Sequence, residues 1–327
     1  MPAPATRQGF VSMNALITGA AGFIGSHLAA QLLARGATVT GLDCFTDYYP
    51  RAMKDANLAV NAGTAGFHFV EGNLLDVDLD ALLDDKTHVF HLAAQAGVRK
   101  SWGRDFQVYT ANNIDATQRL LEACVGRPLD RLVYASSSSV YGDEATIPMR
   151  ETQVPRPVSP YGVTKLAAEQ LCYLYAVNHG IPATSLRYFT VYGPRQRPDM
   201  AFRKFLTAAA SGAPIAVFGD GLQTRDFTFV KDAVAATIAA GERGVPGRAY
   251  NIGGGSRVSL NDVLALVEQV VGRPLQVQRG PAQKGDMRDT YADTSLARAD
   301  LGFVPSVSLA EGLAAEYQWL ASLPVHA

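Results

Sequence analysis

The fold is decided by the stretch Thr18-Gly19-Ala20-Ala21-Gly22-Phe23-Ile24-Gly25-Ser26-His27, which joins a short apolar run to a segment of helical periodicity. Gly19 permits a tight turn, Gly22 lets backbone N–H groups approach a pyrophosphate, and Gly25 lets the helix pack close to the sheet. The N-terminus of that helix then faces the anion. The spacing Gly-x-x-Gly-x-x-Gly therefore predicts a dinucleotide-binding turn, with an ordinary glycine-rich turn as the alternative.

Short apolar or β-branched runs alternate with amphipathic segments from about Asn14 to Arg187. The predicted strands are 15–20, 38–43, 67–72, 88–94, 131–137 and 183–189, and the helical segments between them include 26–35, 111–124 and 161–179. Strands that are apolar throughout are buried on both faces, which is typical of a parallel sheet covered by helices. We therefore predict an α/β fold with a doubly wound parallel sheet of the Rossmann type.

The pattern becomes less regular after Gly193, where Gly and Pro separate shorter segments. The predicted strands here are 215–219 and 249–254, and the predicted helices are 232–242, 260–271 and 309–320. We interpret this part as a second, smaller mixed α/β domain. The division falls between residues 1–187 and 188–327, and the chain is free to cross between the two domains.

The composition is that of a compact globular protein, since 48% of the 327 residues are hydrophobic and 18% are charged. Lys and Arg total 29 against 30 Asp and Glu, which argues against nucleic-acid and membrane-surface partners because both need a concentrated basic face. The three cysteines and six histidines lack Cys-x-x-Cys and His-x-x-x-His spacing, so we expect neither disulfides nor a metal site. Without a signal-peptide layout or an apolar run of roughly 18 residues, the expected location is cytoplasmic.

Asp43 strengthens the dinucleotide interpretation, because it ends the second predicted strand 24 residues after Gly19. A carboxylate at this place accepts hydrogen bonds from both hydroxyls of an adenosine ribose and repels a 2′-phosphate. The alternative is a strand-end turn residue. The sequence thus favours NAD over NADP as the cofactor.

A tyrosine and a lysine lie one helical turn apart in Ser159-Pro160-Tyr161-Gly162-Val163-Thr164-Lys165. Ser159 suits the N-cap and Pro160 the first helical position, so Tyr161 and Lys165 are i and i+4 on one helix face. An ammonium near a phenol lowers the pKa of the phenol, which can then act as a general base. On an isolated amphipathic helix the same spacing arises by chance, and its place after a dinucleotide turn favours the catalytic interpretation.

Four hydroxyls, Ser136 to Ser139, end the strand predicted at 131–137. The carboxyl ends of parallel strands are where ligands bind in open α/β sheets. One hydroxyl can bridge Tyr161 and a hydroxyl of the substrate and relay the proton. The alternative is that these hydroxyls cap their own backbone.

With these motifs the chain resembles the extended short-chain dehydrogenase/reductases, specifically the group of UDP-glucuronate and UDP-glucose 4-epimerases. The resemblance covers nearly the whole chain and rests on TGAAGFIGSHL, GLD, HLAAQAGVR, YASSSSVYG, SPYGVTK, LRYFTVYGPRQRPDM, FGDGLQTRDFTFV and YNIGGGS. It implies that residues 1–187 bind NAD, that residues 188–327 bind a nucleotide sugar, and that the protein is a homodimer through two helices of the first domain.

The resemblance also implies roles for single residues. Tyr161 is similar to the catalytic base, Lys165 to the residue that tunes this base and holds the nicotinamide ribose, and Ser137 to the hydroxyl that completes the triad, although Ser138 is one step away. The other positions that match NAD contacts are Gly19, Gly22, Phe23, Ile24, Gly25, Asp43, Asn73, Leu74 and Ala93. Asn73 departs from the aspartate commonly found at its place.

The substrate positions are similar to those of the UDP-glucuronate 4-epimerases. Ser138, Ser139 and Thr190 match residues that hold the sugar carboxylate, and Arg99 belongs to the AQAGVR motif of this group. Arg197 and Arg225 match positions that clamp the diphosphate and uridine. Arg288 lies near another such position, since Gln283 stands where UDP-glucose epimerases carry an arginine.

The resemblance therefore implies an isomerase that converts UDP-glucuronate to UDP-galacturonate through a transient 4-keto sugar, with NAD as cofactor. A UDP-glucose 4-epimerase or an enzyme for both substrates is one alternative. A UDP-glucuronate decarboxylase is another, although the serine strand lacks the glutamate that decarboxylases usually carry. A non-catalytic NAD-binding sensor is the alternative from a different class.

Overall fold

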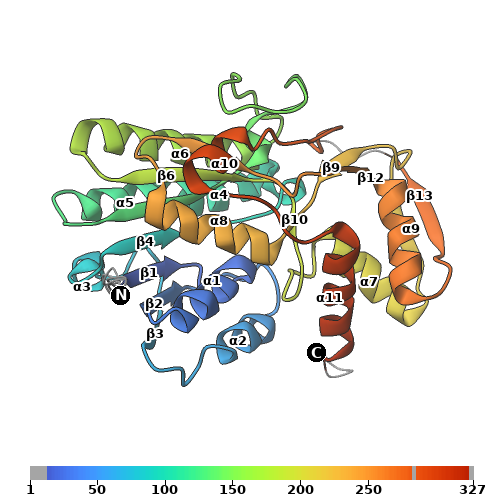
Figure 1. Cartoon of the computed structure of the whole chain (residues 1–327), viewed down its shortest axis with the longest axis horizontal. Helices are drawn as coiled ribbons and strands as arrows, with labels where there is room; N and C mark the ends of the chain where they lie inside the picture. Colours follow the sequence, from blue (N-terminus) through green and yellow to red (C-terminus); the bar gives the residue numbers. More distant parts are fainter. Residues whose placement is uncertain (1–12, 282–284, 324–327) are drawn as a thin grey trace, which may run out of the picture.

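The central feature of the computed structural model, which describes residues 13–281 and 285–323, is a seven-stranded parallel sheet (Figure 1). In sheet order its strands are β11 (Ala249–Ile252), β6 (Ala183–Tyr188), β5 (Arg131–Ser137), β4 (His88–His91), β1 (Asn14–Thr18), β2 (Thr38–Asp43) and β3 (Phe67–Glu71). The order reverses between β1 and β4, which is the switch point where ligands bind in such sheets. The predicted doubly wound parallel sheet is confirmed.

The sheet is buried on both faces, as its apolar strands predicted. Ala15 and Ile17 of β1 belong to one hydrophobic cluster, whereas Leu16 belongs to another. The helices that supply residues to these two clusters include α1 (Phe23–Ala34), α3 (Leu79–Leu83), α5 (Ala116–Cys124), α6 (Pro160–His179), α8 (Val230–Arg243) and α10 (Ser295–Leu301). Two further helices of this part of the chain are α2 (Arg51–Ala59) and α4 (Phe106–Tyr109). Among the described residues, no helix has the length and apolar content to span a membrane.

Helix α6 begins and ends as the sequence predicted. The Ser159 side chain accepts a hydrogen bond of 3.1 Å from the Gly162 N–H, and Pro160 occupies the first turn. Gly180 ends the helix in the left-handed conformation, with φ of 68°. These local signals fix where Tyr161 and Lys165 stand on the helix.

The rest of the chain forms smaller elements beside the sheet, and Figure 1 shows α7, α9, α11 and β13 to one side of it. These elements are β7 (Val191–Tyr192), α7 (Ala201–Ser211), β8 (Ile215–Phe218), β9 (Thr224–Asp226), β10 (Thr228–Phe229), β12 (Arg257–Ser259), α9 (Leu260–Val271), β13 (Val277–Gly280) and α11 (Leu309–Ala321). Between them, α8 and β11 return to the seven-stranded sheet, where β11 pairs with β6. The division at residue 187 stays a prediction.

A buried carboxyl group joins α11 to the loop after β7, and it makes stability depend on pH. Glu316 is fully buried and accepts a 2.9 Å hydrogen bond from the Gly193 N–H. Burial raises the pKa of Glu316 from 4.5 to about 8, while this hydrogen bond and the charge of Arg203 lower it. The folded protein thus holds a proton that the unfolded chain releases, so this contribution to stability is present below about pH 4.5 and is lost as the pH rises through 8.

We therefore expect Glu316→Gln, which is neutral at every pH, to flatten the pH dependence of unfolding. Between about pH 6 and pH 8 the wild type should lose about 1–2 kcal/mol more than the variant. Urea unfolding at several pH values measures this difference. Parallel curves for the two proteins would show that Glu316 is ionised in the folded state.

Candidate active site

A cavity of about 1950 Å³ opens at the carboxyl ends of the parallel strands. It is lined by the ends of β1, β2, β4 and β5 on one side and by α7 and β8 on the other. Every predicted site residue except Arg288 lines it. The structure therefore brings the glycine turn, the serine run and Tyr161 to one cavity.

The glycine turn is packed too closely against backbone for side chains at Gly19 and Gly25. Gly19 has a φ of +74°, and a Cβ there would lie 2.8 Å from the backbone nitrogen of Ala93. A Cβ on Gly25 would lie 2.2 Å from the carbonyl oxygen of Gly19. Gly22 is the N-cap of α1 and provides no side-chain cap, so the first-turn amides remain for an anion. This cradle fits the pyrophosphate of a dinucleotide.

The Asp43 carboxylate is held at the cavity wall by three donors. The N–H groups of Ala21 and Phe45 donate to it over 3.2 and 2.9 Å, and the Lys54 ammonium lies 3.5 Å away. The bond from Phe45 is the local contact of a turn residue, and the ribose contact of Asp43 stays a prediction. Lys54 is buried beside it and was not predicted, because this pairing depends on the packing of α2 against β2.

The other predicted cofactor positions also line the cavity. Phe23 and Ile24 lie in the first turn of α1, and Leu74 and Ala93 follow β3 and β4. The Asn73 side-chain oxygen accepts a 2.9 Å hydrogen bond from the Leu75 N–H, which turns this oxygen toward its own loop. The adenine contact of Asn73 stays a prediction.

Tyr161 lies at the wall of the cavity, in the first turn of α6. Burial raises the pKa of Tyr161, while the positive charge of Arg197 and a hydrogen bond with the Ser137 hydroxyl lower it. The Ser137 oxygen also accepts a 3.1 Å hydrogen bond from the Ser139 N–H, so it caps its own backbone as well. Of the two candidate hydroxyls, Ser137 is the one that acts on the pKa of Tyr161, and the choice between Ser137 and Ser138 stays a prediction.

Lys165 lies one turn below Tyr161 and is almost fully buried. Its ammonium sits 4.4 Å from the centre of the Tyr134 ring, and burial lowers its pKa to about 7. The cation that lowers the pKa of Tyr161 here is Arg197, which sequence reasoning had assigned to the diphosphate. The tyrosine therefore has cationic side chains both beside it and below it.

Three of the four predicted arginines are paired with carboxylates. Arg197 binds Asp199 through two nitrogens, at 2.9 and 3.1 Å. The Arg99 guanidinium lies 2.6 Å from the carboxylate of Asp286. Both guanidinium groups therefore form ion pairs in this structure, and their contacts with an anionic substrate stay predictions.

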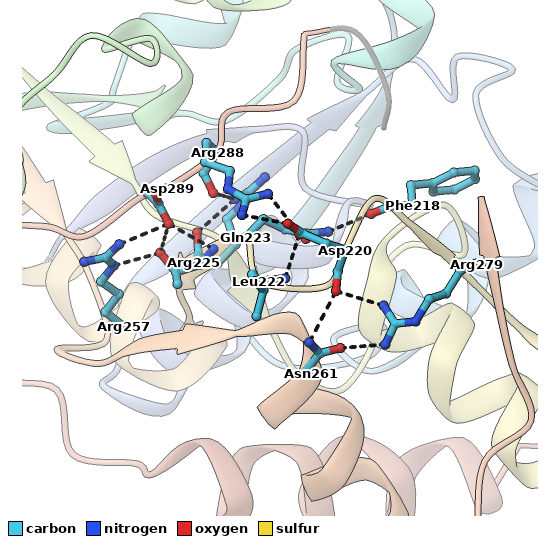
Figure 2. A network of polar contacts seen from close by, with 11 residues as sticks. Phe218, Asp220, Leu222, Gln223, Arg225, Arg257, Asn261, Arg279, Arg288 and Asp289 are labelled. Atoms are coloured by element: carbon cyan, nitrogen blue, oxygen red, sulfur yellow. Dashed lines mark hydrogen bonds and ion pairs between the residues drawn. The ribbon is translucent and has the colours of Figure 1, made fainter. Parts of the chain in front are cut away.

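Arg288 lies outside the cavity lining, and the substrate contact expected of it stays a prediction. Its guanidinium makes two bonds of 2.9 and 3.0 Å to the Asp220 carboxylate, and both side chains are exposed (Figure 2). Arg225 remains at the cavity and donates to the carbonyl oxygens of Thr224 and Arg288. Gln283 lies outside the described residues.

The hydroxyls expected at the sugar also reach the cavity. Ser138 and Ser139 form a short 3₁₀ turn, Ser138–Val140, directly after β5, and Thr190 follows β6. They come from neighbouring strands, since Ser137 and Tyr188 are register partners in the β5–β6 pair. The structure thus places three hydroxyl groups around the carboxyl ends of two adjacent strands.

Besides Lys54, sequence reasoning missed a buried amide near the site. The helix predicted at 111–124 begins as a π-helical segment, Thr110–Asp115, before α5. Asn113 of this segment donates to the Gln95 carbonyl oxygen and to the Thr164 hydroxyl, over 3.1 and 2.9 Å, and accepts from the Gln95 N–H. Helical periodicity does not distinguish the two helix types, so no sequence signal marked this residue.

The chain has close relatives among known proteins. It is 44% identical over 313 residues to a Bacillus subtilis (strain 168) protein named "Uncharacterized UDP-glucose epimerase YtcB", covering 95% of this chain and 99% of that one. A "Probable UDP-glucuronate 4-epimerase" of Rhizobium meliloti (strain 1021) is 37% identical over 330 residues, covering 94% and 96%.

A solved structure is similar to the whole fold. The UDP-glucuronic acid 4-epimerase of Bacillus cereus, in complex with UDP-glucuronic acid and NAD, superposes with a TM-score of 0.92 at 44% identity, covering 94% of this chain and 99% of that one. Residues 15–253 of the chain match the sequence pattern of the NAD dependent epimerase/dehydratase family. The predicted resemblance is confirmed, and the chain belongs to the NAD dependent epimerase/dehydratase family.

Proposed function

We propose that the protein is an isomerase that converts UDP-glucuronate to UDP-galacturonate by epimerisation at C4 of the sugar. The observation that carries the proposal is that one cavity is lined by Tyr161, by Ser137 and by the glycine turn. The relatives named as epimerases of UDP-glucuronate support it. The residue roles that follow are part of the proposal.

NAD is the cofactor, and the family description confirms this prediction. The turn from Gly19 to Gly25 would hold its pyrophosphate and the Asp43 carboxylate its adenosine ribose, while Lys165 would hold the nicotinamide ribose. When bound, NAD supplies the acceptor and donor of the C4 hydride. Because the hydride returns to the same sugar, the reaction needs no external reductant.

Tyr161 moves the proton in this proposal. Its phenolate accepts the proton of the sugar C4 hydroxyl, with the Ser137 hydroxyl between them, and returns the proton after the 4-keto sugar has turned over in the cavity. Arg197, beside Tyr161, favours the phenolate. Arg197 and Arg225 would also anchor the diphosphate, so that the nucleotide end stays fixed while the sugar rotates.

The orientation of the substrate carboxylate has to be controlled, because the 4-keto form of a glucuronate is a β-keto acid. Such an acid loses CO₂ when the bond from C5 to the carboxylate stands perpendicular to the ketone plane. Ser138, Ser139 and Thr190 would hold the carboxylate away from that geometry through hydroxyl groups, with Arg99 at the mouth of the cavity. Hydroxyl groups also accept the hydroxymethyl group of UDP-glucose, which keeps a dual-substrate enzyme as the second candidate.

The product decides between these functions. We expect the purified protein to convert UDP-glucuronate to UDP-galacturonate without added reductant, as followed by NMR of the sugar protons, with UDP-glucose tested in parallel. Release of CO₂ and a UDP-pentose would identify a decarboxylase. No turnover of either sugar by NAD-loaded protein would favour the NAD-binding sensor.

We also propose that the protein forms a homodimer through α6, and that it is cytoplasmic as predicted. Val163, Leu174 and Val177 are 45%, 49% and 62% exposed and lie on one side of α6, where a second copy would cover them. We expect a Leu174→Asp/Val177→Asp variant to sediment as a monomer, because two buried charges oppose association. Val154→Asp, on an exposed loop, is the matched control, and a monomeric wild type would refute the dimer.

A further inference from the structure

A buried ion pair lies next to the catalytic strand, and the proposed chemistry does not use it. Glu169 of α6 and Arg187 of β6 are each 5% exposed at the side chain, and the closest nitrogen and oxygen are 2.6 Å apart. The Arg187 Nε also lies 3.2 and 3.1 Å from the two carboxylate oxygens. A buried pair of this kind gives up hydration on both sides, so its geometry has to be well fixed to be tolerated.

The pair is attached to the serine run at both ends. The Ser136 hydroxyl donates to Glu169 over 2.5 Å, and Ser136 is the residue directly before Ser137. Arg187 is the register partner of Ser136 and donates to the Tyr141 hydroxyl over 2.8 Å. Residues 136 and 141 are thus both fixed to one ion pair, and Ser137, Ser138 and Ser139 lie between them.

Glu169 also belongs to the helix face that carries the catalytic tyrosine. Tyr161, Lys165 and Glu169 follow one another at i, i+4 and i+8 of α6, so they form one row along the helix. Lys165 packs on Tyr134 of β5, and Glu169 binds Ser136 of the same strand. The helix and the strand therefore meet at two contacts, one turn apart.

We propose that Glu169 is a positioning residue of the active site: through Ser136 and Arg187 its carboxylate fixes the Ser137 hydroxyl and the Lys165 ammonium relative to Tyr161. This inference rests on the proposed epimerase function. Glu169 does not touch the reacting atoms, and it acts through the strand end and the helix that carry them. A displacement of a catalytic group by about 1 Å is enough to lower a rate by roughly 10²-fold.

The charge of Glu169 adds a second effect. The groups that face Lys165 are Tyr134 of β5, His91 of β4, which burial keeps neutral by lowering its pKa to about 3, and Cys172 and Glu169 of α6. Burial lowers the pKa of Lys165, whereas the negative charge of Glu169 raises it. Loss of that charge makes the ammonium easier to deprotonate. If Lys165 tunes Tyr161 as the resemblance implies, a neutral lysine favours the phenolate less than an ammonium does.

The test compares Glu169→Gln with Ser136→Ala and with the control Ser185→Ala, another buried serine, on β6. For the sugar that the wild type turns over, Glu169→Gln should lower kcat about 10-fold to 100-fold with little change in KM. The acid limb of its kcat profile should move to higher pH by roughly half a unit to one unit. Ser136→Ala should lower kcat about 3-fold to 10-fold without moving that limb.

Amide hydrogen exchange in the substrate-free protein tests the same inference without any turnover. We expect faster exchange confined to residues 136–141 in Glu169→Gln and Ser136→Ala, and none in Ser185→Ala. Glu169→Gln could instead lose stability while its kcat, its pH profile and its local exchange remain those of the wild type. That result would overturn the positioning role. If Glu169→Gln does not fold, Ser136→Ala provides the test. A kcat and an exchange rate equal to those of the wild type in that variant would overturn the positioning role. A wild type that turns over no UDP-sugar would refute the proposed function, while the exchange measurement still tests the anchoring.

Discussion

Tyr161→Phe is expected to lower the turnover of the UDP-sugar by roughly 10²-fold or more, which is the loss that follows removal of a general base. The variant keeps the ring and its packing but loses the phenol oxygen that Ser137 contacts. The ring of Tyr109 lies edge-on to that of Tyr161, with centroids 6.3 Å apart, so the phenylalanine should stay in place. The fold and the binding of NAD should therefore remain.

The measurement is single-turnover epimerisation by NAD-loaded protein, with Tyr173→Phe as the control. Tyr173 lies on the same helix and is 54% exposed, so this variant removes a phenol oxygen outside the cavity. In the wild type we expect the rate to fall toward acid pH, because protonation of Tyr161 removes the base. Burial raises the pKa of Tyr161, and Arg197 and Ser137 oppose that rise. Near-normal turnover in Tyr161→Phe would refute its role as base.

The sequence allowed prediction of the features that depend on neighbours along the chain. The glycine turn and the helix begun by Ser159 and Pro160 each depend on residues within two helical turns, and both stand where they were expected. The alternation of apolar runs with amphipathic segments predicted a parallel sheet. The apolar runs do not reveal the order of the strands in the sheet. The pairing of β11 with β6, as the seventh strand, therefore could not be predicted.

Contacts between distant segments could not be predicted. Glu169 and Ser136 are 33 positions apart, and Lys54 reaches Asp43 only because α2 packs on the strand end. The ion pair of Arg288 with Asp220 likewise joins segments 68 positions apart and had no sequence signal (Figure 2). Charge complementarity between loops decides such pairings, and one sequence does not show which loops meet.

Gly25→Ala is expected to produce the largest loss of stability among the variants considered, because the added Cβ meets backbone and not a movable side chain. It would lie 2.2 Å from the carbonyl oxygen of Gly19 and 3.0 Å from the Cα of Ala20. Relief requires α1 to move away from the turn that follows β1. Overpacking of a rigid interior costs about 1–3 kcal/mol, and a contact with backbone belongs at the upper end of that range.

Gly22→Ala is the matched control within the same turn, since its Cβ would meet one atom, the Gly19 carbonyl oxygen, at 3.0 Å. In thermal unfolding, the midpoint temperature of Gly25→Ala should thus lie well below that of Gly22→Ala, and that of the wild type should be the highest. Movement of α1 would also displace the first-turn amides, so Gly25→Ala should lose NAD during purification. Equal stability of the two variants would mean that α1 shifts freely, and the cradle could not then hold a pyrophosphate by its shape. The predicted order therefore tests stability and cofactor binding through the same 2.2 Å contact.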